Sequence, residues 1–139
     1  KTIDLISIGV VSEDGRTYYA EVEGCDLSRA NDWVKANVIP HLDGINLFSR
    51  KEIADDLVKF MGHNPEIWAY YGAYDWVVLC QLFGTMMDLP KSWPMFVHDV
   101  KQLNSSLGGP KLPEQTSTEH NALADAIWTK EAWLFMSKL

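Results

Sequence analysis

The chain has 139 residues, of which 47% are apolar and 22% are charged. This is enough for one domain with a hydrophobic core and too little for two of ordinary size, and the composition excludes disordered and fibrous classes. The net charge of -7 excludes a partner held by a broad basic surface, but not a protein whose acidic groups bind metal ions.

The sequence contains no membrane or secretion signal. No apolar run approaches the roughly 20 residues that span a bilayer, and no signal-peptide pattern opens the chain. We therefore expect a cytoplasmic protein without membrane contact. Cys25 and Cys80 lie in no C-x-x-C pair and beside no histidine at metal-ligand spacing. They are predicted to be reduced, largely buried thiols.

A hairpin is predicted at the start of the chain. Residues 2–11 and 16–22 are rich in β-branched, aliphatic and aromatic side chains, as in strands. Between them lies Asp14-Gly15, a strong short-range signal for a tight turn. The two segments should therefore pair in antiparallel fashion.

Two amphipathic helices are expected to follow. The first starts with Ser28 as its cap and ends at Pro40. The second starts at a capping box formed by Ser49 and Glu52 and stops at Gly62. The apolar face of the second helix is predicted to comprise Ile53, Leu57, Val58 and Met61.

Strands and helices alternate in the second half of the chain. The predicted segments are a strand at 66–72, a helix at 73–84, a short strand at 93–100, a short helix or turn at 100–109, a loop at 108–117 and a last helix from near His120 to the end. The buried stripe of the last helix should be Ala122, Leu123, Ala126, Ile127, Trp133 and Leu134. This order predicts an α/β domain with a mixed sheet.

Asp75 follows the aromatic strand "EIWAYYG" and a turn that Gly72 makes possible. It should lie at the carboxyl end of that strand, where open α/β sheets gather their ligands. The same position suits a helix cap, whose side chain accepts the free amide protons of the first turn. From position alone, capping is at least as good an interpretation as a functional role.

His120 and Asp125 lie five residues apart at the start of the last helix. Along a regular helix five residues turn about 500°, which would leave the two side chains about 140° apart. They can share a site only if Asn121 is the N-cap, with His120 on the preceding loop. Asp125 borders the apolar stripe and needs a partner, either a metal ion or a nearby lysine, arginine or backbone donor. A lone histidine here would otherwise be a cap or surface residue.

These motifs together resemble the DEDDh 3'-to-5' exonucleases of the ribonuclease-H-like fold. "HNALADA" is similar to the closing His-x-Ala-x-x-Asp motif through His120 and Asp125, and Asp75 to the aspartate of the second motif. "TIDLISIGVVSEDGRTYYA" and "WAYYGAYDWVVLCQLFG" look most similar to the small exoribonuclease family known from mycobacteria and phages. The resemblance covers nearly the whole chain and implies a mixed five-stranded sheet flanked by helices.

The superfamily's first motif, an Asp-x-Glu on the central strand, is not in this sequence. Asp4 belongs to a later strand, and no glutamate follows it two residues on. A domain without its central strand would expose the edges of both neighbouring strands. Residues 1–139 are therefore expected to form one exonuclease domain whose first strand, with its two acidic residues, lies upstream of Lys1.

The resemblance also implies a mechanism. Two divalent cations, Mg²⁺ or Mn²⁺, would lie about 4 Å apart, activate a water and stabilise the leaving 3' oxygen. Asp125 and Asp75 would be metal ligands, in keeping with the preference of these ions for oxygen. His120 would be the general base for the attacking water, because the ordinary pKa of histidine, about 6.5, lies near working pH.

The implied substrate is a single-stranded 3' end, RNA in preference to DNA, with its last base stacked on an aromatic surface. Tyr71, Tyr74 and Trp76 flank Asp75 and are candidates, although core packing is the expected role of at least two of them. Asp99 is expected to cap a helix. The remaining expectations are that Trp68 and Trp133 lie in the core and that His41, His63 and His98 are structural or exposed.

Other interpretations stay open. A non-catalytic binding or assembly module of the same fold would also account for the absent first motif. A nucleotide-binding domain of another type is disfavoured, because neither common glycine-rich phosphate loop occurs. A homodimer could form through Trp128, Trp133 and Phe135, although a helix packed on its own sheet would show the same residues.

Overall fold

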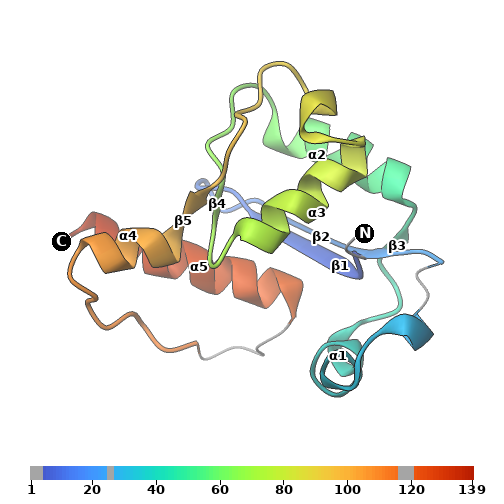
Figure 1. Cartoon of the computed structure of the whole chain (residues 1–139), viewed down its shortest axis with the longest axis horizontal. Coiled ribbons are helices and arrows are strands. Elements are labelled where there is room, and N and C mark those ends of the chain that lie inside the picture. Colours follow the sequence, from blue (N-terminus) through green and yellow to red (C-terminus); the bar gives the residue numbers. More distant parts are fainter. Residues whose placement is uncertain (1–4, 25–26, 116–120) are drawn as a thin grey trace.

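Two small sheets organise the fold. The computed structural model of the chain describes residues 5–24, 27–115 and 121–139. In the first sheet, β1 (Ser7–Val11) and β2 (Thr17–Val22) form the predicted antiparallel hairpin (Figure 1). The other neighbour of β2 is β3 (Leu47–Phe48), which runs parallel to it. β3 was not predicted, because two residues carry no recognisable alternation.

The second sheet consists of β4 (Trp68–Ala69) and β5 (His98–Asp99), paired in parallel. The fold is thus mixed α/β as expected, but the described strands form a three-stranded and a two-stranded sheet instead of one five-stranded sheet. A continuous sheet requires neighbouring strands about 4.8 Å apart joined by backbone hydrogen bonds. No such ladder joins the two sheets within the described residues. Instead α5 (Ala122–Ser137) packs against β1 and β2 and also contacts β4.

The first helix is shorter than predicted. α1 spans Asp32–Asn37, and its N-cap is Asn31, whose side chain accepts the amide proton of Val34 at 2.9 Å. Ser28 and Pro40 lie instead in separate single turns. The 3-10 turns are η1 (Leu27–Arg29), η2 (Ile39–His41) and η3 (Met86–Asp88). Serine and asparagine are equally good caps, so local preference could not choose between the two starts.

The second helix, α2 (Arg50–Met61), begins at the predicted capping box. The side chain of Ser49 accepts the amide proton of Glu52 at 3.1 Å, and the Glu52 side chain accepts that of Ser49 at 3.0 Å. Leu57 is fully buried, whereas Val58, expected on the same face, is 40% exposed. The buried face of α2 is therefore narrower than predicted.

Helices follow both strands of the second sheet, as predicted. α3 (Ala73–Phe83) follows β4, and α4 (Val100–Ser106) follows β5. α3 packs against α2, while α4 lies against α5 (Figure 1). The buried side chains accordingly form one cluster among β1, β2, α2 and α3, and another between α4 and α5. In the described part of the chain, no helix has the length and apolarity to cross a membrane.

The buried side of α5 differs from the predicted stripe. Ala132 and Met136 are buried, whereas Ile127 and Leu134 are 39% and 38% exposed. The helix packs on β1 and β2 and also on α4. Its buried residues therefore lie on more than one side of the helix instead of along one stripe. A prediction from one sequence periodicity assumes a single packing face.

Candidate active site

The turn between β4 and α3 presents Asp75. α3 starts after Gly72 and has no side-chain cap, so the capping alternative for Asp75 is wrong. Asp75 instead occupies the first turn of the helix, at the carboxyl end of β4. Gly72 is required for space, because a Cβ atom there would lie 2.8 Å from the Cβ atom of Ala69.

Asp99, at the end of β5, holds this turn in place. Its Oδ1 atom accepts the backbone amide proton of Tyr71 at 3.1 Å, and its Oδ2 atom accepts that of Gly72 at 2.9 Å. Oδ1 also accepts the amide proton of Lys101 at 2.8 Å and so caps α4, as predicted. Hydrogen bonds to a carboxylate are stronger than neutral ones. Asp99 is thus a structural clamp between neighbouring strand ends.

Asp125 lies in the first turn of α5. The helix has the predicted N-cap, Asn121, whose side chain accepts the amide proton of Ala124 at 3.0 Å. The Oδ1 atom of Asp125 accepts a hydrogen bond from Nε2 of Gln115 at 2.9 Å. Gln115 was not anticipated, because no motif spacing links it to Asp125. His120 lies outside the described residues, and its role stays a prediction.

The aspartates act on one another electrostatically. Partial desolvation of the carboxyl group raises the pKa of Asp75, although the residue as a whole is exposed, and the negative charges of Asp125 and Asp99 raise it further. These effects oppose that of the helix dipole, which favours negative charge in a first turn. Among the described residues, no hydrogen-bond donor contacts the Asp75 carboxylate to offset the repulsion. Asp75 and Asp125, which come from separate motifs, therefore interact electrostatically.

A cation would neutralise this acidity. Within the described ranges, no group of three or more histidine, cysteine, aspartate or glutamate residues is arranged to hold a metal ion. Mg²⁺, however, is commonly bound by one or two protein carboxylates together with waters and substrate phosphates. Asp75 and Asp125 fit such an open arrangement, and the described residues do not form a cage made of protein alone.

The three aromatic candidates beside Asp75 behave differently. Trp76 packs against the core, whereas Tyr71 is 62% and Tyr74 73% exposed. The expectation that at least two of them serve core packing is therefore wrong. Tyr71 has a φ of 52°, in the left-handed region that residues other than glycine rarely adopt, and its amide is held by Asp99. Two accessible tyrosine rings thus accompany the acidic site.

The tryptophans of α5 make contacts within the chain. Nε1 of Trp128 donates a hydrogen bond to the Pro113 carbonyl at 2.8 Å. The rings of Trp133 and Trp68 lie 6.1 Å apart and both pack against the buried cluster between α4 and α5, as predicted. Of the three residues suggested for a dimer surface, Trp128 and Trp133 are partly buried, and Phe135 is 38% exposed.

The remaining candidate ligands have structural surroundings. Cys80 is a free, buried thiol whose pKa is raised by burial, as expected of a reduced core residue. Cys25 lies outside the described residues. The His98 ring stacks on Trp68 at 4.7 Å between centroids. Within the described residues, Cys80 and His98 belong to no group that could hold a metal ion.

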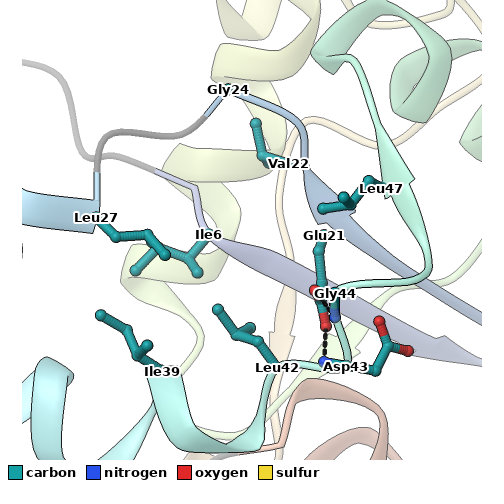
Figure 2. A pocket seen from close by; sticks show the side chains of 10 residues that line it. All are labelled: Ile6, Glu21, Val22, Gly24, Leu27, Ile39, Leu42, Asp43, Gly44 and Leu47. Atoms are coloured by element: carbon teal, nitrogen blue, oxygen red, sulfur yellow. Dashed lines mark hydrogen bonds between the residues drawn. The ribbon is translucent and has the colours of Figure 1, made fainter.

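A separate hollow lies between β2 and the loop before β3 (Figure 2). Glu21, 3% exposed, accepts the backbone amide protons of Asp43 at 2.6 Å and Gly44 at 2.9 Å. The Tyr19 hydroxyl also donates to Glu21, and burial followed by this bond raises the pKa of Tyr19. No predicted site residue lines the hollow. Its glutamate holds the loop.

Comparison with known proteins identifies the family. Residues 1–137 match the family described as "Rv2179c-like: 3'-5' exoribonuclease Rv2179c-like domain". Two curated relatives are "3'-5' exoribonuclease Rv2179c" of Mycobacterium tuberculosis strain ATCC 25618 / H37Rv and "3'-5' exoribonuclease MT2234.1" of strain CDC 1551 / Oshkosh. Each is 45% identical over 132 residues, which cover 90% of this chain and 79% of the relative. The chain belongs to the family of Rv2179c-like 3'-5' exoribonuclease domains.

Proposed function

We propose that this chain removes nucleotides from the 3' end of single-stranded RNA by hydrolysing the terminal phosphodiester. The observation that carries the proposal is the convergence of Asp75 and Asp125, which come from separate motifs and act on one another strongly enough to contribute to the raised pKa of Asp75. The choice of RNA is supported by the family and by the names of both mycobacterial relatives.

In this proposal Asp75 and Asp125 bind two divalent cations, Mg²⁺ or Mn²⁺. Such ions, when bound, stabilise negative charge on the phosphate and lower the pKa of a bound water. Gln115 steadies one oxygen of Asp125, and Asp99 steadies the turn before Asp75. Assignment to the DEDDh superfamily is supported by the order of Asp75, His120 and Asp125 along the chain.

His120 is the proposed general base. His120 and Asp125 can share a site only if α5 begins after His120. α5 begins at Ala122, with Asn121 as its N-cap. Asp125 thus lies on the helix, and this start of α5 is the one that the proposed convergence with His120 needs. In this position the imidazole would take a proton from the attacking water.

The last base of the RNA is proposed to stack on Tyr71 or Tyr74. Both rings are exposed beside the turn that carries Asp75. A base stacked on an aromatic ring gains about 1–3 kcal/mol in single-stranded complexes, with little sequence preference. Trp76, packed against the core, would support α3 from behind.

The direct test follows a single-stranded RNA oligonucleotide labelled at either end, with Mg²⁺ or with a chelator. The 3' label should be released at once as a mononucleotide, while the 5'-labelled strand shortens stepwise. Asp125→Asn should abolish shortening, whereas Asp55→Asn, on the exposed surface of α2, should not. Trimming in the chelator, or full activity of Asp125→Asn, would contradict the proposal. RNA binding without trimming would favour the non-catalytic module.

His120→Ala tests the base separately. It should lower turnover by about 10²- to 10⁴-fold, the usual contribution of a general base. Binding of Mn²⁺, measured by electron paramagnetic resonance, should persist because histidine is not a ligand in this proposal. A loss of Mn²⁺ affinity would show that the assigned role is wrong.

A further inference from the structure

At Gly9 the backbones of β1 and α5 lie too close together to leave room for a Cβ atom. Gly9 lies in the middle of β1, opposite Tyr19 of β2. A Cβ atom at this position would lie 2.4 Å from the carbonyl carbon of Ala122 and from the amide nitrogen of Leu123. Both are backbone atoms, so no side-chain rotation can relieve the overlap.

The glycine is not needed for the conformation of the strand. The φ of Gly9 lies outside the left-handed region, so an alanine could adopt the same backbone angles. Glycine in the interior of a strand is unfavourable, because it adds chain entropy and packs no side chain. The feature that requires glycine here is the contact with α5.

This contact lies at the start of the helix that carries Asp125. Ala122 is the first residue of α5, and Asp125 follows within the same turn, its amide donating to the Asn121 carbonyl at 2.9 Å. Ordinary van der Waals contact begins at 3.4 Å, so a methyl group at Gly9 would displace this turn by about 1 Å.

Asp75 is held by a different contact. Its helix starts at the turn held by Asp99 of β5, which belongs to the other sheet. Lifting the first turn of α5 from β1 therefore changes the separation between the Asp125 and Asp75 carboxylates. A misplacement of about 1 Å within a catalytic arrangement can lower a rate by about 10²-fold.

We propose that Gly9 is a positioning residue, which sets the distance between the two aspartates by admitting the backbone of α5 onto β1. This inference rests on the proposed exonuclease function and adds a residue that touches neither substrate nor cation. A single methyl group at Gly9 should therefore lower the catalytic rate of a protein that still folds.

Gly9→Ala is the test, with Gly62→Ala as the matched control. Gly62 ends α2 with a φ of 67°, and a Cβ atom added there would have nothing within 4 Å, so its substitution strains the backbone without touching α5. Gly9→Ala should lower kcat by about 10²-fold with KM within about 3-fold of wild type, and should weaken Mn²⁺ binding. Gly62→Ala should lower thermal stability while leaving kcat and Mn²⁺ affinity near wild type.

Folding of the variant is monitored by circular dichroism. If Gly9→Ala is unfolded at the assay temperature, the comparison is repeated in sucrose, which favours the folded state. If wild type is active and a folded Gly9→Ala keeps both its kcat and its Mn²⁺ affinity, the positioning role is wrong. The proposed exonuclease function would still stand. If wild type itself leaves RNA intact, the proposed function fails and the positioning role fails with it.

Discussion

The Oδ2 atom of Asp99 accepts the backbone amide proton of Gly72 at 2.9 Å. This hydrogen bond joins the end of β5 to the turn that opens α3, and so ties the position of Asp75 to the neighbouring strand. The residue that steadies the acidic site is thus itself acidic, but its oxygens are engaged with backbone amides.

Asp99→Ala should destabilise the fold. The substitution removes the acceptor for the amides of Tyr71, Gly72 and Lys101, and bonds of this kind to a carboxylate contribute about 1.5–3 kcal/mol each at most. We expect a loss of about 2–3 kcal/mol in the free energy of unfolding, since water can replace part of the contact. Urea denaturation measures the loss. Asp55→Ala should stay within about 0.5 kcal/mol of wild type, and an equal loss in both variants would contradict the clamp.

Asp75→Asn should be more stable than wild type at pH 7 in the presence of a chelator. The raised pKa means that the folded state binds the Asp75 proton more tightly than the unfolded chain does, so ionised Asp75 opposes folding. This unfavourable contribution of ionised Asp75 to folding disappears as pH falls from the raised pKa through the ordinary value of 3.8. The advantage of Asp75→Asn should shrink to nothing over that window in urea titrations at several pH values.

Asp14→Asn supplies a control of opposite sign. A hydrogen bond from Ser12, followed by one from Arg16, lowers the pKa of Asp14. Ionised Asp14 therefore favours folding above its ordinary pKa, and this contribution is lost as pH falls through the lowered value. Asp14→Asn should be less stable than wild type at pH 7. If both variants shifted stability in the same direction, the assigned electrostatics would be wrong.

Divalent cations should stabilise wild type more than either site variant. A ligand that binds only the folded state adds about 2.7 kcal/mol at 100 times its Kd, which raises Tm by several degrees. Mn²⁺ should therefore raise the Tm of wild type in a thermal melt, with a smaller effect on Asp75→Asn and Asp125→Asn. Asp14→Asn should respond like wild type. Equal shifts in all four proteins would place the cation elsewhere.

Tyr71→Gly should separate stability from RNA binding. The φ of 52° is unfavourable for tyrosine by about 1–2 kcal/mol but open to glycine. The variant should therefore gain about 1 kcal/mol of stability at most, because glycine also adds entropy to the unfolded chain. If the ring binds the terminal base, KM for RNA should rise. A variant with unchanged KM would remove Tyr71 from the substrate site.

Tyr74→Ala should weaken RNA binding without affecting the fold. The side chain is 73% exposed, so its removal should change stability by less than about 0.5 kcal/mol. Loss of one stacked base corresponds to about 1–3 kcal/mol, a rise in KM of about 5- to 150-fold. Tyr74→Phe keeps the ring and should restore the wild-type KM. An increase shared by both variants would argue against stacking.

Much of the local structure could be predicted from short segments. The capping box of Ser49 and Glu52, the turn at Asp14 and the cap at Asn121 depend on hydrogen bonds between residues a few positions apart. The residues that make these interactions lie within one short segment of the sequence. The prediction of Ser28 as the cap of the first helix was wrong, because Asn31, which satisfies the same local rule, is the N-cap.

The sequence by itself located the two proposed metal ligands, Asp75 at the start of one helix and Asp125 at the start of another. Only the tertiary structure decided how they are held, through the Asp99 clamp, the Gln115 hydrogen bond and the close approach at Gly9. These contacts join segments that are distant in the chain, and their geometry depends on how two sheets and α5 pack together. Such distances cannot be predicted from side-chain type and short-range spacing, because a contact between distant segments forms only when the whole chain folds.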